Sequence, residues 1–255
     1  MTQLMLRTPA HVLLETNLSI ITPVFNESEN LPELVNRLAQ SLNHIDFELV
    51  IVDDNSPDGT AAIAEELNME HHNIKVMKRP KKLGLSSAVL EGFTASAPET
   101  RVLAVMDADM QHPPELLAKM YEKIVEGADL VIASRYIKGG GTKGWRLSRK
   151  IISRYATALA HLLLPETRNI KDVLSGFFMV KRKVINKATL DPIGYKILLE
   201  ILIKGNYVNA CEVPYLFETR KNGKSNLSLK EILKFAIHVK RLLRSRKLKR
   251  EVSIS

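Results

Sequence analysis

The chain has 255 residues, and 45% of them are hydrophobic, which is enough for a sizeable core in one large domain or two small ones. This composition excludes a disordered or fibrous protein. Lysine and arginine number 37 against 28 aspartate and glutamate residues, a formal net charge of +9, so phosphates, nucleic acids and anionic lipid head groups are candidate partners. Seven of the basic residues lie within residues 240–250, and the rest of the chain is much less basic than the total.

The single cysteine, Cys211, excludes an internal disulfide and a cluster of thiolate metal ligands, which agrees with a reducing compartment. No apolar run approaches the roughly 20 residues that a membrane-spanning helix requires. Residues 1–15 also lack the apolar core of a secretory signal. We therefore expect a cytoplasmic protein.

Short apolar runs alternate with amphipathic stretches through the first half of the chain. Strands are predicted at residues 19–23, 47–54, 73–78, 101–109 and 128–134. Helices are predicted between them, at 30–42, 60–67, 85–93 and 113–125, the first capped by Asn30 with Glu33 as its cap partner. This alternation predicts an α/β fold, with a mostly parallel sheet and helices on both faces.

The pattern changes after Ser134. Residues 134–150 are rich in glycine and basic residues and predict a mobile loop around Trp145, which is either a lid or a plain connection. Residues 151–165 predict an amphipathic helix, which we expect to pack on the core rather than on a membrane. Strands at 176–180 and 209–217, a helix at 195–204 and a basic final helix from about Leu229 complete the chain.

Polar turns follow three of the predicted strands. They are residues 23–27 after the first strand, 52–60 at the end of the second and 107–115 at the end of the fourth. Because ligands of parallel sheets bind beyond the carboxyl ends of the strands, we expect these turns to form an active or binding site on one rim.

The turn at 107–115 has the side chains for a metal site. Asp107, Asp109 and Gln111 supply oxygen ligands of the kind that Mg²⁺ or Mn²⁺ prefers. A lone D-x-D is a weak signal, and its position at the end of a strand strengthens it. The neighbouring His112 is expected to be a surface turn residue. A metal with so few protein ligands commonly completes its shell with a diphosphate.

A nucleotide diphosphate is therefore the expected ligand of the rim. The chain has no G-x-x-x-x-G-K-[ST] sequence, which disfavours a P-loop kinase or ATPase. Asp53 and Asp54, with Glu27 nearby, could accept hydrogen bonds from a base or ribose. The alternative for part of this segment is that Ser56 or Asp58 caps the following helix.

Taken in order, PVFNESENL, VDDNSPDGT, KKLGLSSAVLEGF, DADMQHPPE, SRYIKGGGTKGW and SGFFMVKR resemble the inverting nucleotide-sugar glycosyltransferases of family 2. Among these the chain is most similar to the dolichyl-phosphate (polyprenyl-phosphate) mannosyltransferases. The resemblance runs from about Ser19 to Asn226 and implies a Rossmann-like, GT-A type fold. We accordingly expect an N-terminal extension over 1–18, a catalytic domain over 19–227 and a basic amphipathic helix over 228–255.

The resemblance also implies roles for individual residues. Pro23, Phe25, Glu27, Asp54 and Arg220 match positions that hold the nucleotide, and Phe25 stands where the family more often has tyrosine. Asp107, Asp109 and Gln111 match the metal ligands, and Asp109 counts among the catalytic residues with Arg135, Arg149 and Ser153. The last three match residues that receive the phosphate groups near the acceptor.

One departure lies near residue 220. The family commonly has R-x-x-G-x-S-K, and this chain reads RKNGKSN, so Asn226 replaces a lysine that contacts the donor phosphate. Lys224 lies two positions earlier and could substitute for it.

The activity that follows from the resemblance is transfer of a hexose to a polyprenyl (dolichyl) phosphate with inversion. Mannose from GDP-mannose is the expected donor, and UDP-glucose or another sugar nucleotide is the alternative. A nucleotide-sugar-binding protein without turnover is a second class. The basic tail predicts peripheral association with an anionic membrane surface, and family members also recruit membrane-anchoring subunits. The tail could instead bind nucleic acid, but the carboxylate-rich rim argues against it.

Overall fold

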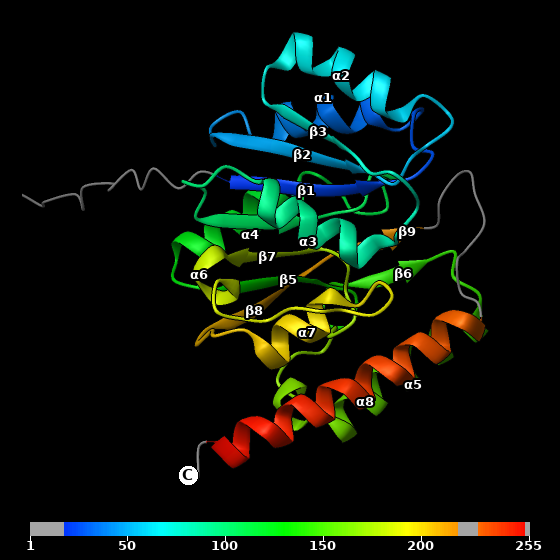
Figure 1. The fold of residues 1–255 in the computed structure, drawn as a ribbon, viewed down its shortest axis with the longest axis vertical. Coiled ribbons are helices and arrows are strands. Elements are labelled where there is room, and N and C mark those ends of the chain that lie inside the picture. Colours follow the sequence, from blue (N-terminus) through cyan, green and yellow to red (C-terminus); the bar gives the residue numbers. More distant parts are fainter. Residues whose placement is uncertain (1–17, 219–228, 253–255) are drawn as a thin grey trace, which may run out of the picture.

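A computed structural model describes residues 18–218 and 229–252. Its centre is a seven-stranded sheet in the order β3-β2-β1-β4-β7-β5-β8, which Figure 1 shows from top to bottom. The strands are β1 (Leu18–Val24), β2 (Phe47–Asp53), β3 (Ile74–Lys78), β4 (Val102–Val105), β5 (Leu130–Ser134), β7 (Phe178–Lys181) and β8 (Ala210–Pro214). All run parallel except β7, which lies antiparallel between β4 and β5. The prediction of a mostly parallel sheet is confirmed.

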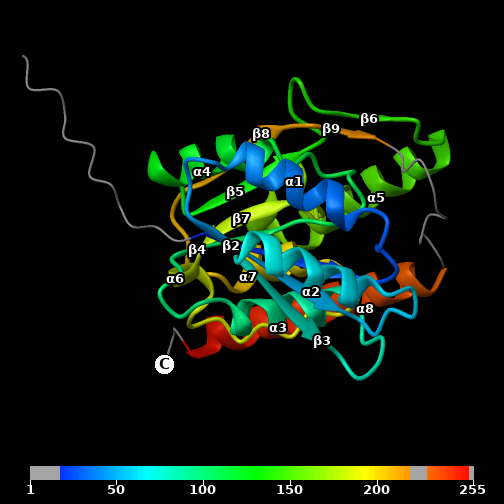
Figure 2. The same cartoon turned by 90° about the horizontal axis from the view of Figure 1, so that it is seen from above.

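Helices cover both faces of the sheet, as predicted. On one face lie α1 (Leu31–Ser41), α2 (Thr60–His71) and α4 (Leu116–Val125), and on the other lie α3 (Leu85–Ala95), α5 (Leu147–Leu163), α7 (Ile197–Lys204) and α8 (Leu229–Val252). Two short helices, η1 (Pro165–Thr167) and α6 (Arg182–Ile185), lie in connections. Figure 2 shows α1 and α4 on one side of the sheet and α3 and α8 on the other. Both faces are therefore buried, which explains the continuous apolar runs of the central strands.

The register of β1 and β2 determines where their polar turns emerge. Pro23 pairs with Val52 and Val24 pairs with Asp53, and the Asp54 N–H donates to the Val24 carbonyl at 3.0 Å. Because the two strands end side by side, the turns after them leave the sheet at the same edge.

A second, two-stranded sheet stands beside this edge. Its strands, β6 (Gly141–Lys143) and β9 (Leu216–Glu218), pair in parallel. The strand predicted at 209–217 is thus divided between two sheets. The expectation of a loop over 134–150 is wrong for 141–143, and Trp145 is buried against Phe217 with ring centroids 5.2 Å apart.

Two local predictions are corrected by the structure. Asn30 is the N-cap residue of α1, as predicted, but it has a helical conformation and makes no side-chain cap hydrogen bond, and its amide donates instead to Glu27 Oε2 at 2.5 Å. Helix α5 does not bury the apolar face that we expected to join the core, since only Thr157 and Ala160 are buried. Three large side chains of α5 are mostly exposed: Leu147 at 72%, Tyr155 at 74% and Leu162 at 69%.

The basic final helix begins at Leu229, as predicted. It packs on the domain through Val239 and Leu242, which are buried, and through His238, whose Nε2 lies 3.2 Å from Glu200 Oε2 of α7. Within residues 18–218 and 229–252, no helix is both long enough and apolar enough to cross a membrane.

Candidate active site

The turn after β1 forms the first wall of the site. The Glu27 N–H donates to Thr60 Oγ1 at 3.0 Å, which fixes this turn against the start of α2. Phe25 is half-buried, and the Lys82 ammonium lies 3.3 Å from the centroid of its ring. A cation over an aromatic face is attracted by the ring quadrupole, so Lys82 stabilises this ring in place.

Asp54 organises the neighbouring loop. Its buried carboxylate accepts hydrogen bonds from the N–H groups of Leu83 (3.3 Å) and Gly84 (2.9 Å) and pairs with the guanidinium of Arg79. Gly84 has a φ of +103°, a conformation that a side chain would disfavour. Both oxygens of Asp54 are thus engaged by the protein, and its predicted contact with a nucleotide stays a prediction.

The turn after β4 carries the three predicted metal ligands and brings two of them, Asp109 and Gln111, together. Met110 adopts a φ of +61°, which turns the chain sharply between Asp109 and Gln111. Asp109 Oδ1 accepts the Gln111 N–H at 3.1 Å, and the Gln111 amide donates to the Glu218 carbonyl of β9 at 2.7 Å. The turn is therefore tied to the second sheet, an arrangement that no local sequence pattern indicates.

His112 is not a surface residue, so that expectation is wrong. It is 2% exposed and stacks on Phe177, with centroids 4.9 Å apart and an interplanar angle of 20°. The Asp107 N–H donates to His112 Nδ1 at 2.9 Å, so this nitrogen acts as an acceptor and bears no proton. The ring holds the backbone of Asp107 and supports the turn from the core side.

A cavity of about 1060 Å³ opens along one side of this turn. Its wall includes Glu27, Asp109 and Gln111, together with Asp58 and Glu218, so it is rich in carboxylates. The structure thus brings one predicted nucleotide residue and two predicted metal ligands to the same cavity.

The donor set fits a hard divalent ion. The described part of the chain contains no group of three or more His, Cys, Asp or Glu side chains that could hold a metal ion. Asp107 and Asp109 supply two carboxylates, so an ion here would need the Gln111 oxygen, water and phosphate oxygens to complete its shell. Mg²⁺ and Mn²⁺ accept such a shell.

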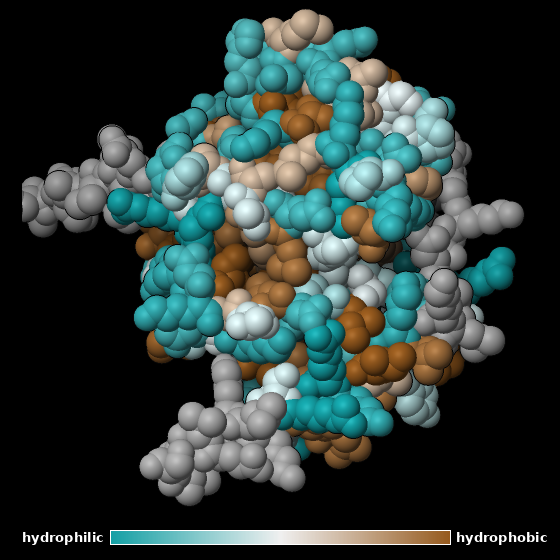
Figure 3. Space-filling model, viewed as in Figure 1, coloured by the Kyte–Doolittle hydropathy of each residue, from teal (hydrophilic) through white to brown (hydrophobic). Residues whose placement is uncertain are grey.

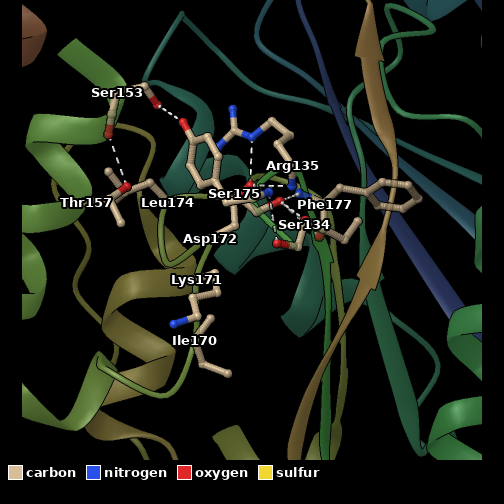
Figure 4. A network of polar contacts seen from close by, with 12 residues as sticks. Ser134, Arg135, Ser153, Thr157, Ile170, Lys171, Asp172, Leu174, Ser175 and Phe177 are labelled. Carbon is tan, nitrogen blue, oxygen red and sulfur yellow. Dashed lines mark hydrogen bonds and ion pairs between the residues drawn. The ribbon is translucent and has the colours of Figure 1, made fainter. Parts of the chain in front are cut away.

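Arg135 and Asp172 form a buried ion pair, shown in Figure 4, and Arg135 is one of the residues predicted to lie near the acceptor phosphate. Nε and one terminal nitrogen of Arg135 each donate to the Asp172 carboxylate at 2.7 Å, and the Arg135 backbone N–H donates to it at 2.9 Å. Burial lowers the pKa of Arg135, but the hydrogen bonds and charge of Asp172 outweigh it and the net pKa is raised. Arg135 is therefore a permanent cation, and one terminal nitrogen of its guanidinium is not bonded to Asp172.

Helix α5 contributes the other two predicted residues. The Arg149 guanidinium lies 4.1 Å from the centroid of the Trp145 ring. The Tyr136 hydroxyl donates to Ser153 Oγ at 2.7 Å, which links α5 to the residue next to Arg135. Arg135, Arg149 and Ser153 thus lie in one neighbourhood, as expected. Arg220 and Asn226 lie outside the described residues.

Sequence reasoning missed Asp172 and Lys196. The Lys196 ammonium donates to the Leu174 carbonyl at 3.1 Å, beside the turn that holds Arg135. Neither residue belongs to a recognisable motif. The only indication of Asp172 is its position shortly before the strand predicted at 176–180.

Comparison with known proteins gives consistent matches. The family described as Glycosyl transferase family 2 matches residues 19–189. The dolichol-phosphate mannosyltransferase of Pyrococcus furiosus is 46% identical over 226 residues, which are 89% of this chain and 63% of that protein. The chain thus spans just under two thirds of that relative. The polyprenol monophosphomannose synthase of Mycolicibacterium smegmatis is 35% identical, covering 86% of this chain and 84% of that protein. The dolichol-phosphate mannosyltransferase of Saccharomyces cerevisiae is also 35% identical, with coverages of 88% and 86%.

Solved structures agree on the fold. Glucosyl-3-phosphoglycerate synthase from Mycobacterium tuberculosis, in complex with Mn²⁺, UDP-glucose and phosphoglyceric acid, superposes with a TM-score of 0.64 at 19% identity, over 91% of this chain and 79% of that chain. Its complex with Mn²⁺, UDP and glucosyl-3-phosphoglycerate gives 0.61 at 20% identity, over 91% and 80%. These likenesses show the GT-A fold. Since the family match alone extends from β1 past β7, the chain belongs to glycosyl transferase family 2.

Proposed function

We propose that this chain transfers a hexose, most simply mannose from GDP-mannose, to a polyprenyl (dolichyl) phosphate, with inversion at the sugar C1 and with the help of Mg²⁺ or Mn²⁺. The names of the three relatives support this substrate class. The observation that carries the proposal is that the Asp107–Gln111 turn and the Arg135–Asp172 pair lie at one edge of the sheet, since β4 and β5 are both antiparallel to β7 and end at the same edge.

The donor would lie against the turns after β1, β2 and β4. Phe25, whose ring has Lys82 over one face, would contact the base, and Glu27 lies in the same cavity as Asp109. Asp107, Asp109 and Gln111 would hold the divalent ion, which neutralises charge on the diphosphate when bound. These residues would in this way keep the diphosphate at the turn after β4.

The acceptor phosphate would approach from the side of Arg135 and Arg149. One of its oxygens forms the new bond to C1, while the bond from C1 to the diphosphate oxygen breaks and the nucleoside diphosphate leaves with the electron pair. A phosphate monoester with a second pKa of ~6 is largely ionised at neutral pH, so the reaction requires no strong general base. Positioning and charge stabilisation by the arginines then supply most of the rate enhancement.

The geometry of Arg135 limits how it can bind. Its Nε–H and one N–H of a terminal nitrogen are already used by Asp172, so the two N–H groups of the other terminal nitrogen and the second N–H of the bonded one would be the donors to a phosphate. The buried carboxylate thus fixes the guanidinium before the substrate arrives. Such preorganisation lowers the cost of binding.

Helices α5 and α8 would face the membrane that holds the lipid. Helix α5 exposes Leu147, Tyr155 and Leu162, has basic Lys150 and Arg154 exposed among them, and contains no acidic residue. The two helices are in contact, and α8 exposes the apolar side chains of Leu233 and Ile237. Figure 3 shows hydrophobic side chains at the surface in this part of the molecule. Apolar side chains flanked by positive charge fit an anionic lipid surface. This arrangement supports peripheral binding, which we assign to the cytoplasmic face, with or without an anchoring subunit.

The donor is tested by offering GDP-mannose and UDP-glucose separately, each with Mn²⁺ and polyprenyl phosphate. We expect faster transfer from GDP-mannose, and faster transfer from UDP-glucose would assign the rival donor. Calorimetry that detects binding of a sugar nucleotide without any turnover would instead indicate a binding protein.

A further inference from the structure

Lys196 lies on the acceptor side of the rim. Because β7 is antiparallel to β4 and β5, the turn that precedes it emerges at the same edge as their carboxyl ends. The Leu174 carbonyl belongs to this turn and accepts a hydrogen bond from the Lys196 ammonium at 3.1 Å. Lys196 itself directly precedes α7 and is half-buried.

The turn at residues 172–175 is anchored at both ends and contacts two cations. Asp172 binds Arg135 at one end, as Figure 4 shows, and Ser175 Oγ donates to the Ala133 carbonyl at 2.8 Å at the other. The position of Lys196 is therefore fixed relative to Arg135 through a few covalent bonds of one turn. An ammonium has three donors, and among the described residues Leu174 is its one hydrogen-bond acceptor.

The charges around Lys196 favour an incoming anion. Its electrostatic neighbours are the cations Arg135 and Arg149 and the carboxylates Asp172 and Asp107. Asp172 is already used by Arg135. Burial and the charge of Arg135 lower the pKa of Lys196 to about 7, a value that an added anion would raise.

We propose that Lys196 is a phosphate-binding residue, which donates to the acceptor phosphate together with Arg135 and Arg149. A phosphate dianion placed there provides the counter-charge that these three cations share. The inference rests on the proposed function. The alternative is that Lys196 only tethers the start of α7 to the turn.

The test compares Lys196→Met, which keeps the aliphatic stem, with Lys196→Arg, which keeps the charge. Lys187→Met, at an exposed lysine outside the site, is the matched control. We expect Lys196→Met to raise the KM for polyprenyl phosphate by about tenfold to a hundredfold, the value of a charge-assisted hydrogen bond, and to leave the KM for the sugar nucleotide within about twofold. Lys196→Arg should recover most of the loss, and Lys187→Met should behave as the wild type.

Binding is measured separately from turnover through Trp145, the only tryptophan of the chain, which stacks on Arg149. Titration with a short prenyl phosphate should change the fluorescence of Trp145. The dissociation constant for the prenyl phosphate should be raised in Lys196→Met and not in Lys196→Arg or Lys187→Met. An unchanged dissociation constant and acceptor KM in Lys196→Met, with or without loss of thermal stability, would reduce Lys196 to a tether and overturn the inference. If the wild type bound prenyl phosphate but transferred no sugar to it, the proposed function would be contradicted, whereas the role of Lys196 in phosphate binding would not.

Discussion

Arg135 and Asp172 form a buried bidentate ion pair, in which two nitrogens of the guanidinium each lie 2.7 Å from a different carboxylate oxygen. They are separated by 37 residues in the chain, and the turn that carries Asp172 also carries the carbonyl that binds Lys196. The carboxylate therefore positions the cations that we assign to the acceptor phosphate.

Replacing Asp172 by Asn should disrupt both stability and transfer. The change keeps the shape of the side chain but leaves the buried Arg135 without a counter-charge, so we expect the free energy of unfolding to fall by about 3 kcal/mol. Denaturant unfolding measures it. Glu33→Gln, which affects the exposed pair with Arg37, is the control and should cost less than about 1 kcal/mol. Equal losses of unfolding free energy in the two variants would show that the buried Arg135–Asp172 pair stabilises the fold no more than an exposed pair.

Asp109→Ala should abolish transfer with little loss of folding. The residue lies in a turn beyond the end of β4, and its predicted role is to hold the divalent ion. We expect a fall in kcat of at least about a hundredfold, the usual effect of removing a group that stabilises transition-state charge. Asp46→Ala, at an exposed aspartate before β2, is the control. Near-normal turnover in Asp109→Ala, measured across a Mn²⁺ titration, would contradict the predicted role of Asp109 as a metal ligand.

His112→Phe should separate ring packing from hydrogen bonding. Phenylalanine can keep the stack on Phe177 but cannot accept the Asp107 N–H, and a lost buried acceptor costs about 1–3 kcal/mol. We also expect a higher Mn²⁺ requirement, because the backbone of a predicted ligand loses its support. Thermal unfolding and a Mn²⁺ titration measure the two effects, and a variant as stable as the wild type would contradict the role of Nδ1.

The exposed apolar side chains of α5 should govern membrane binding. Changing Leu147, Tyr155 and Leu162 together to Gln should weaken binding to anionic vesicles by at least about tenfold without destabilising the fold. Met69→Gln on α2 is the control, since Met69 is equally exposed on the opposite face of the sheet. Sedimentation with vesicles gives the measurement, and equal binding of the triple variant and the wild type would exclude α5 as the contact.

Asp129 should contribute stability that disappears in acid. Burial raises its pKa, but the Lys183 ammonium and the N–H groups of Val208 and Asn209 outweigh this and lower it to about 2. A depressed folded-state pKa means that the contribution is complete above the unfolded value of ~3.9 and is lost as the pH falls through 2. Asp129→Asn should therefore reduce the free energy of unfolding by about 1–2 kcal/mol at pH 7 and by much less near pH 2. A difference that does not change with pH would contradict this assignment.

The sheet and its rim could be predicted from sequence because their signals are local. An apolar run followed by D-x-D-x-Q places Asp107 and Asp109 at the end of a strand without knowledge of the rest of the fold. Other contacts join segments that are distant in sequence. They are the stacking of His112 on Phe177, the ion pair of Asp172 with Arg135 and the contact of His238 with Glu200. Such contacts depend on tertiary placement, and periodicity and spacing carry no information about them.

The surroundings of helix α5 could not be predicted from its sequence either. Its apolar stripe resembles that of a helix packed on a core, and only the structure shows that few of these side chains are covered. Amphipathicity identifies an apolar face but does not identify what that face contacts.

Transfer of a sugar to a lipid phosphate on this rim can be measured with radiolabelled GDP-mannose, Mn²⁺ and polyprenyl phosphate. We expect the wild type to move label into the organic phase and Asp109→Ala to move none. Absence of lipid-soluble label with any sugar nucleotide, or equal label from the wild type and Asp109→Ala, would contradict the proposed function.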